Sequence, residues 1–253
     1  MRLTDRCVIV TGGGHGIGRA YATRCAQEDA AVVVADIDGE AAISVAAAIT
    51  AGGGAALGME ADVRSLASME TVVGRAEERF GGVDGLINNA GMLTIIPISR
   101  VGFESIDAAE WDNVLATNLK GTWLACRAAA PAMRRRGGGS IVNIGSGTFF
   151  LGSPTRAHYV ASKGGVIGLS RVLSRELASD NIRVNVIVPG STLSEDNPSE
   201  EIIKMRATPL ANRSIKRIEL PEDLTGTAIF FLSSDSAFIT GQTLVVEGGG
   251  ILH

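Results

Sequence analysis

Short apolar runs alternate with longer helical patterns along the 253 residues, and this rhythm constrains the fold more than any other feature. Several of the short runs are continuously apolar, which is typical of strands buried on both faces. The predicted strands are 7–10, 31–35, 55–59, 85–87, 140–144, 183–188 and 243–246. The predicted helices are 16–27, 39–51, 66–79, 107–135, 155–179 and 221–232. The alternation predicts an α/β fold, a single doubly wound Rossmann domain over residues 1–253, with a seven-stranded parallel sheet flanked by helices on both faces.

Composition and charge narrow the possible functions. The formal net charge is −4, and basic residues cluster only at 134–136, so we expect no nucleic-acid partner. Cys7, Cys25 and Cys126 form no C-x-x-C pair, which argues against a disulfide framework or a metal site and fits a reducing compartment. We recognise no signal peptide and no run long enough to span a bilayer. The sequence therefore indicates a soluble, cytoplasmic protein with no membrane partner.

A glycine-rich turn follows the first predicted strand and opens the first predicted helix. Gly12, Gly16 and Gly18 would let a pyrophosphate approach free N–H groups at a helix N-terminus, where a Cβ would obstruct it. The spacing is G-x-x-x-G-x-G and not G-x-G-x-x-G, so a simple strand-to-helix turn stays an alternative. Its place after the first strand favours a nucleotide site that includes His15 and Ile17.

Asp36 ends the second predicted strand, where a carboxylate can accept hydrogen bonds from both ribose hydroxyls of an adenosine. The same charge would repel a 2′-phosphate. The flanking positions are Ala35 and Ile37, and neither is an arginine. The sequence therefore favours NAD over NADP. The alternative is that Asp36 merely caps the helix that begins near Gly39.

Two later turns add candidate cofactor contacts. Asp62 and Val63 follow the third predicted strand and could frame the edge of the adenine. Asn89, Ala90 and Gly91 follow the fourth strand in a tight turn beneath the cofactor, where an asparagine side chain can bridge strands.

Tyr159 and Lys163 are four residues apart on a predicted helix and project from the same face. A tyrosine with its ordinary pKa of about 10 is a poor base, but a nearby cation favours the phenolate and lowers that pKa. Ser146, after the fifth strand, can offer its hydroxyl to a substrate oxygen, and Asn118 can hold a water that links Lys163 to solvent. Alone, Y-x-x-x-K could be a helix surface and Asn118 a core amide; together they indicate proton-transfer chemistry.

These motifs resemble the short-chain dehydrogenase/reductase family over essentially the whole chain, and the final segment is similar to its aryl-alcohol and secondary-alcohol dehydrogenases. The resemblance implies a tetrad of Asn118, Ser146, Tyr159 and Lys163. In it Tyr159 is the general acid/base, and Lys163 lowers its pKa and binds the nicotinamide ribose. Ser146 orients the substrate oxygen and Asn118 anchors a proton relay. The matching pieces are the glycine-rich turn, 62–63, 88–91, the four tetrad positions, 189–190 and 239–249.

The same resemblance implies further contacts and an oligomer. Pro189, Gly190 and Thr192 would meet the nicotinamide end of the cofactor, and the long central helices and last strand would form a homotetramer. Two segments without clear periodicity are expected to serve as a substrate loop, 92–106, and a lid, 191–218. The first is longer than the loop at this place in the family that the chain resembles.

The candidate pocket walls indicate a hydrophobic secondary alcohol or its ketone, unless these side chains pack onto the sheet instead. Arg100 or Arg156 could clamp a carboxylate and His158 could line the pocket, or each could be structural. The apolar candidates are Met92, Leu93, Ile95, Ile96, Phe149, Phe150 and Leu151.

The expected activity is that of an NAD-dependent alcohol dehydrogenase. One alternative is a 3-oxoacyl-thioester reductase of the acyl-carrier-protein type, which usually prefers NADPH and is disfavoured by Asp36. A catalytically silent nucleotide-sensing module is another, but such proteins tend to lose the tyrosine or the lysine, and this chain has both.

Overall fold

The computed structural model describes residues 1–93 and 95–252, built around one seven-stranded parallel sheet in the order β3-β2-β1-β4-β5-β6-β7. The strands are β1 (Cys7–Thr11), β2 (Ala31–Asp36), β3 (Ala55–Glu60), β4 (Gly85–Asn88), β5 (Gly139–Ile144), β6 (Ile182–Pro189) and β7 (Thr243–Val246). The predicted fold class is confirmed. The strand order reverses between β1 and β4, and ligands of doubly wound folds bind at such a switch point, beyond the carboxyl ends of the strands.

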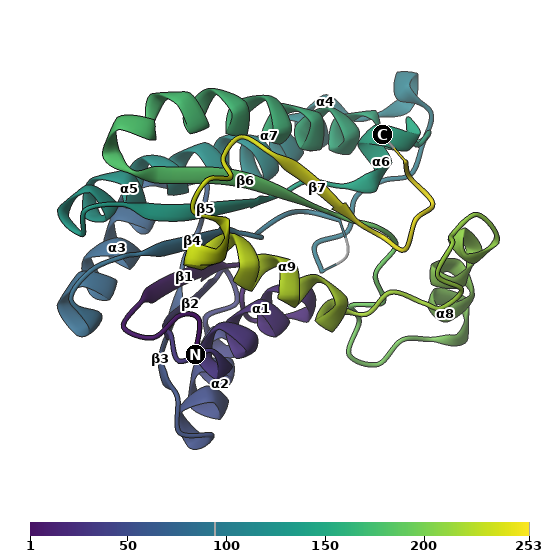
Figure 1. Cartoon of the computed structure of the whole chain (residues 1–253). Helices are drawn as coiled ribbons and strands as arrows, with labels where there is room; N and C mark the ends of the chain where they lie inside the picture. The colour runs from purple at the N-terminus through teal and green to yellow at the C-terminus, as the bar shows by residue number, and fades with distance from the viewer. Residues whose placement is uncertain (94, 253) are drawn as a thin grey trace.

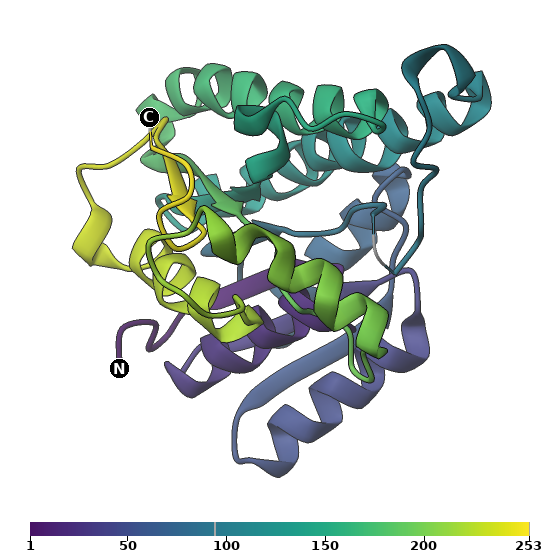
Figure 2. The ribbon, with the colours of Figure 1, turned by 90° about the vertical axis from the view of Figure 1, so that its right-hand side faces the viewer.

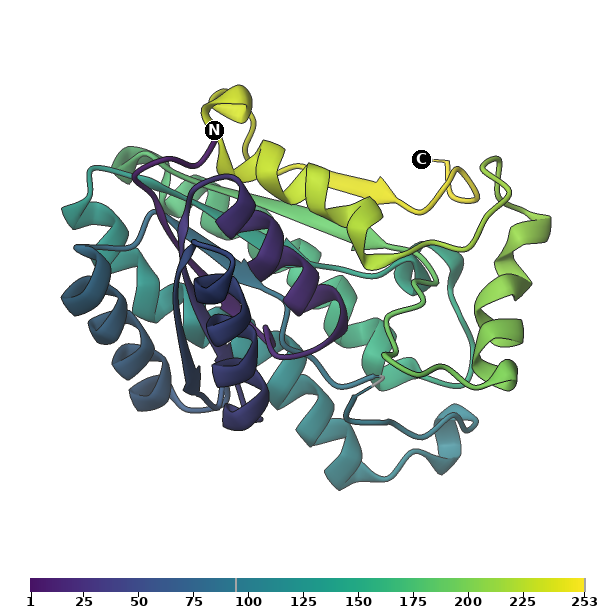
Figure 3. The ribbon, with the colours of Figure 1, turned by 90° about the horizontal axis from the view of Figure 1, so that it is seen from below.

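Helices cover both faces of the sheet (Figures 1 and 3). On one face lie α1 (Gly16–Gln27), α2 (Gly39–Ala51) and α9 (Pro221–Leu232). On the other lie α3 (Leu66–Phe80), α4 (Ala108–Leu115), α5 (Gly121–Arg135) and α7 (Ala157–Glu176). The period of two along each strand divides the buried side chains between two cores: Cys7 and Ile9 pack toward α3 and α5, whereas Val8 and Val10 pack toward α1 and α9.

Short polar side chains determine where several helices begin. The side chains of Asp38, Ser65 and Asp107 accept backbone N–H bonds at the first turns of α2, α3 and α4. Because Asp38 caps α2, the alternative in which Asp36 is the cap of that helix is wrong.

The single helix predicted over 107–135 is interrupted. A π-helical turn, η2 (Ala116–Lys120), separates α4 from α5 and contains the fully buried Asn118. The hydroxyl of Thr122 donates to the Asn118 carbonyl at 2.8 Å. A π turn changes the helical register by part of a turn and is common at functional sites. Hydrophobic periodicity predicts a continuous helix here because α4 and α5 each keep an apolar face.

Two segments project beyond the carboxyl ends of the strands. The segment 92–106, of which Thr94 lies outside the described residues, contains the 3₁₀ turn η1 (Phe103–Ser105). The segment 191–218 contains α8 (Glu200–Ala207) and the 3₁₀ turn η4 (Thr208–Ala211). Figure 2 looks onto this end of the molecule with α8 in front. Neither α8 nor the short α6 (Gly147–Leu151) was predicted, because each is too short to show a clear period.

Within the described chain, no helix is long and apolar enough to cross a membrane. The same residues hold no group of metal-ligating side chains. The three cysteines are buried free thiols, and burial raises the pKa of each to about 12. These thiols therefore stay protonated and serve as small core residues.

Candidate active site

A cavity of about 680 Å³ opens at the switch point between β1 and β4. It extends from the end of β2 to the start of α7 and is bounded by both projecting segments. Predicted site residues in its walls are Gly12, His15, Gly16, Ile17, Asp36, Ile37, Asp62, Val63, Asn89, Ala90, Gly91, Ser146, Tyr159, Lys163, Pro189, Gly190 and Thr192. Gly18 and Asn118 are the predicted site residues that do not line it.

The glycine-rich turn has the backbone geometry that requires glycine at two positions. Gly12 and Gly16 have φ of 62° and 47°, in the left-handed region. A Cβ on Gly18 would lie 1.8 Å from the Gly12 carbonyl oxygen. Gly18 therefore lets α1 pack against the turn from behind, while Gly12 and Gly16 face the cavity. The first N–H groups of α1 have no partners within the helix, as an anion site requires.

Backbone hydrogen bonds hold the Asp36 carboxylate in place. Its two oxygens accept from the N–H groups of Gly14 at 2.9 Å and Asp38 at 3.0 Å. A carboxylate has further lone pairs, so it can still accept hydrogen bonds from a ligand in the cavity. Nearby, Asp62 pairs with Arg64, a cavity residue that the sequence analysis missed, at 2.8 Å.

Tyr159, Lys163 and Ser146 meet in the centre of the cavity. The first two are buried on α7, with the Lys163 Nζ 5.9 Å from the centre of the Tyr159 ring and donating to the Ile144 carbonyl at 2.9 Å. The Ser146 side chain lies close enough to the Tyr159 phenol to oppose the rise in its pKa that burial causes. Ser146 also begins α6, where its oxygen accepts from the Thr148 hydroxyl at 2.9 Å. The structure thus brings together three of the four residues of the predicted tetrad, and their catalytic roles stay predictions.

Asn118 lies behind this centre and connects it to the 92–106 segment. Its side-chain oxygen accepts from the Met92 N–H at 2.8 Å, and its amide nitrogen lies 3.2 Å from the Ser162 hydroxyl. A Cβ on Gly91 would lie 3.3 Å from that oxygen and 3.6 Å from the Lys163 Nζ. The structure thus places Asn118 close to Lys163, with its side chain already engaged in positioning the backbone.

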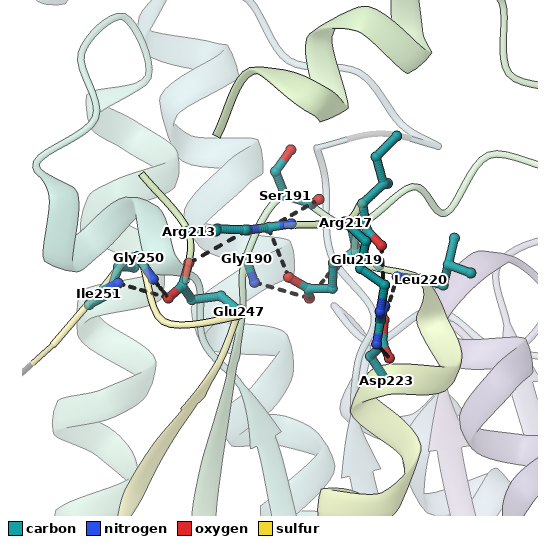
Figure 4. Close-up of polar contacts among 12 residues, drawn as sticks. Gly190, Ser191, Arg213, Arg217, Glu219, Leu220, Asp223, Glu247, Gly250 and Ile251 are labelled. Atoms are coloured by element: carbon teal, nitrogen blue, oxygen red, sulfur yellow. Dashed lines mark hydrogen bonds and ion pairs between the residues drawn. The ribbon is translucent and has the colours of Figure 1, made fainter. Parts of the chain in front are cut away.

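A buried charge cluster supports the predicted nicotinamide end of the cavity (Figure 4). Glu219 accepts from the Gly190 N–H at 3.2 Å and from the Thr192 hydroxyl at 2.8 Å. Arg213 pairs with Glu219 at 3.0 Å and with Glu247 at 3.7 Å. The cluster joins the lid, the start of α9 and the segment after β7. Sequence reasoning missed it because its members are far apart and belong to no motif.

The segment 191–218, the predicted lid, also contacts the glycine-rich turn. The Ser194 carbonyl oxygen would lie 2.9 Å from a Cβ on Gly16, and Arg19 of α1 pairs with Asp196. On the opposite side, the Arg100 guanidinium lies 3.9 Å from the Met205 sulfur, so the 92–106 segment and α8 touch.

The predicted apolar wall is partly correct. Met92, Leu93, Ile95, Ile96 and Leu151 line the cavity, and Met205 and Ile251 add to them. Phe149 and Phe150 do not line it. Their rings pack edge to face at 5.2 Å, with Phe149 against Gly164 of α7 and Phe150 against the core beneath α7.

Of the three polar candidates near the substrate end, two line the cavity and one does not. Arg100 and Arg156 line the cavity. His158 does not: it is fully buried, stacks on Trp111 at 6.4 Å and lies 3.6 Å from Glu110. The structural alternative for His158 is therefore correct.

Comparison with known proteins identifies the family. A family profile described as short chain dehydrogenase matches residues 6–201. The chain belongs to the short-chain dehydrogenase family. It is 37% identical to 2-(S)-hydroxypropyl-CoM dehydrogenase 3 of Xanthobacter autotrophicus, covering 98% of this chain and 97% of that one. It is 32% identical to a 3-oxoacyl-[acyl-carrier-protein] reductase of Thermotoga maritima, over the full length of both.

A solved structure from Sinorhizobium meliloti 1021, described as a short-chain alcohol dehydrogenase, has the same fold. Its TM-score is 0.89 at 35% identity, covering 98% of this chain and 97% of that one. The protein is thus an oxidoreductase of a family whose dehydrogenases use nicotinamide cofactors.

Burial sets the acid–base properties of this short-chain dehydrogenase. It raises the pKa of Tyr159, and the hydrogen bond from Ser146 and the positive charges of Arg156 and Arg206 oppose that rise. It also lowers the pKa of Lys163 to about 8. In the protein alone, loss of hydration outweighs these favourable interactions, and the lowering of the Tyr159 pKa by Lys163 stays a prediction.

Proposed function

We propose that this short-chain dehydrogenase transfers a hydride between NAD(H) and a hydrophobic secondary alcohol or ketone, with Tyr159 as general acid/base. The observation that carries the proposal is the meeting of Tyr159, Ser146 and Lys163 in the cavity that the glycine-rich turn also lines. Gly12 and Gly16 would receive the pyrophosphate, and Pro189, Gly190 and Thr192 would border the nicotinamide.

The chain's own residues account for the proton transfer. A nicotinamide cofactor bound in this cavity would supply the hydride acceptor for oxidation of the alcohol and the hydride donor for reduction of the ketone. Tyr159 takes the hydroxyl proton during oxidation and returns it during reduction. Ser146 donates a hydrogen bond to the substrate oxygen. The Lys163 ammonium stabilises the phenolate, and its bond to the Ile144 carbonyl fixes its position.

The choice of NAD rests on Asp36. Its carboxylate lines the cavity and is held by two backbone N–H groups, so it would accept bonds from ribose hydroxyls and repel a 2′-phosphate. Arg64 is the nearby cation that could favour NADP, but Asp62 engages it through paired hydrogen bonds of 2.9 and 2.8 Å.

Steady-state rates with both cofactors test this proposal. We expect a panel of secondary alcohols to be oxidised with NAD, measured by the absorbance of the reduced nicotinamide. Asp36→Ala should weaken NAD binding about tenfold or more and improve the relative use of NADP. A strong NADPH preference with 3-oxoacyl thioesters would instead support the reductase alternative.

The organisation of the protein is part of the same proposal. We propose a single domain, with 92–106 as substrate loop and 191–218 as lid, acting in the cytoplasm as a homotetramer. Support for an oligomer comes from an apolar hollow between α4, α5 and α7 that Leu115, Leu119, Trp123 and Leu169 line.

A further inference from the structure

Three arginines from separate parts of the chain converge on the substrate end of the cavity. Arg100 comes from the 92–106 segment, Arg156 from the residue before α7 and Arg206 from α8. All three line the cavity that Tyr159 lines. Burial lowers the pKa of Arg156, and repulsion from Arg100 and Arg206 adds to that effect. The Arg100 guanidinium also lies 3.9 Å from the sulfur of Met205, the residue before Arg206 in α8, so these arginines come from segments in contact.

The acidic side chains do not balance these charges. Arg206 pairs with Glu195. Among the residues with described positions, neither Arg100 nor Arg156 has a carboxylate within ion-pair distance. Within the part of the chain that the structure describes, the side chain of Arg156 reaches only the Pro154 carbonyl, at 3.5 Å, and that of Arg100 only the Met205 sulfur. Glu247, another acidic residue of the cavity wall, faces the buried Arg213.

Like charges gathered at a partly buried site raise the free energy of the folded protein unless an anion joins them. Guanidinium groups suit this role because their planar donors bind carboxylate, sulfonate or phosphate oxygens in pairs. Between these groups and Tyr159 the wall is apolar, formed by Met92, Ile95 and Met205 among others.

We infer that the substrate is an anionic secondary alcohol or ketone, whose negative group binds Arg156 together with Arg100 and Arg206 across a short apolar spacer. This inference rests on the proposed function and narrows its substrate class. The apolar walls would contact the middle of such a molecule, between its reacting carbon and its anionic group.

The cofactor phosphates are the competing anion. The residues fitted to them, Gly12 and Gly16, lie in the turn after β1 and at the first position of α1, whereas Arg156 is three positions before Tyr159, at the reacting end. The test must therefore use protein already saturated with NAD, so that the phosphate sites are filled before the probe is added.

Calorimetric titration of two matched ketones into the NAD-saturated protein tests the inference without turnover. The probes are 4-oxopentanoate and the neutral 2-pentanone. We expect the carboxylate to bind about tenfold to a hundredfold more tightly, as charge-assisted hydrogen bonds provide. A sulfonate and a phosphate monoester of similar length show which anion fits. Equal affinity for 4-oxopentanoate and 2-pentanone, or no binding of any anionic probe, would overturn the inference.

Variants assign the effect to the arginines. Arg156→Gln should bring the affinity ratio of charged to neutral ketone close to one, and Arg156→Lys should keep part of it because the charge remains. Arg79→Gln, which removes a positive charge from α3 outside the cavity, is the control and should leave the ratio unchanged. An unchanged ratio in a folded Arg156→Gln protein would contradict the inference.

Turnover separates this inference from the proposed function. Oxidation of 2-pentanol with NAD, without any preference for 4-hydroxypentanoate, would support the function and remove the anion site. Binding of 4-oxopentanoate that depends on Arg156, with no oxidation of any alcohol in either series, would support the anion site and remove the proposed chemistry.

Discussion

At the scale of single residues, burial shifts the pKa values of two side chains on one face of α7 in opposite directions. Burial raises the pKa of the Tyr159 phenol and lowers that of the Lys163 ammonium to about 8, since it disfavours the charged form of each. Each charge is costly alone, but the phenolate and the ammonium would stabilise each other. In the proposed function, transfer of a proton from substrate to Tyr159 is therefore linked to the charge of Lys163.

Removal of the Tyr159 hydroxyl tests its role directly. In the Tyr159→Phe variant we expect kcat with any accepted alcohol to fall at least about a hundredfold, because the proton has no acceptor. NAD binding, measured by fluorescence titration, should remain within a few fold. Turnover equal to that of the unchanged protein would show that another group is the base.

The pKa of Lys163 predicts a pH dependence of stability. The unfolded chain holds this proton up to the ordinary value of 10.5, whereas the folded protein loses it above about 8. Stability from this group therefore rises with pH between these two values. Urea unfolding of the cofactor-free protein measures this effect. The free energy of unfolding of the unchanged protein, minus that of the Lys163→Met variant, should increase with pH across this window. A difference that is flat or falls there would contradict the shift.

At the scale of elements, a buried cluster of one arginine and two glutamates anchors the 191–218 segment. Arg213 is 2% exposed and pairs with both Glu219, just before α9, and Glu247, just after β7. Because Glu219 also accepts from the Gly190 N–H, these two segments are held to the loop at Gly190. Glu247 also accepts from the N–H groups of Gly250 and Ile251, which shapes the last part of the cavity wall. Removing the arginine would leave two carboxylates buried without a counter-charge.

Two arginines of the lid provide a matched comparison. Arg213→Met should lower the free energy of unfolding by about 3–5 kcal/mol, because the uncompensated charges stay buried. Arg217→Met removes an exposed arginine that pairs with Asp223, and should have little effect. Denaturant unfolding measures both. If both variants lost a similar free energy of unfolding, burial would not be the reason for the contribution of Arg213 to stability.

The sequence predicted elements well where a repeating pattern existed. Buried strands such as β1 and β2 could be recognised from their continuous apolar runs, and the Tyr159 to Lys163 spacing indicated two residues that both line the cavity. The π turn at Asn118, the short α8 and the contact of Arg213 with Glu247 could not be found this way. Each depends on contacts between distant segments, which leave no local period. Phe149 and Phe150 were misassigned because an aromatic side chain fits core and pocket walls equally.

At the scale of the whole molecule, the apolar hollow at Trp123 predicts the state of assembly. Trp123 is 39% exposed, on the face of α5 beside Leu119 and Leu169. Large exposed apolar groups commonly mark interfaces. Trp123→Glu should shift the protein from the proposed tetramer toward smaller species in light scattering. Arg75→Glu on α3, away from this hollow, should not. A monomeric unchanged protein would refute the tetramer.

The amide of Asn118 has a consequence for how the substrate range could diversify. It holds the Met92 backbone on one side and the helical turn of Ser162 on the other, so the first residue of the 92–106 segment and the proposed base, Tyr159, share one support. Substitutions at the tip of that segment should then be accepted freely in directed evolution toward new alcohols. Few substitutions that displace its first residue should be tolerated, because they would misalign the proposed base for every substrate at once.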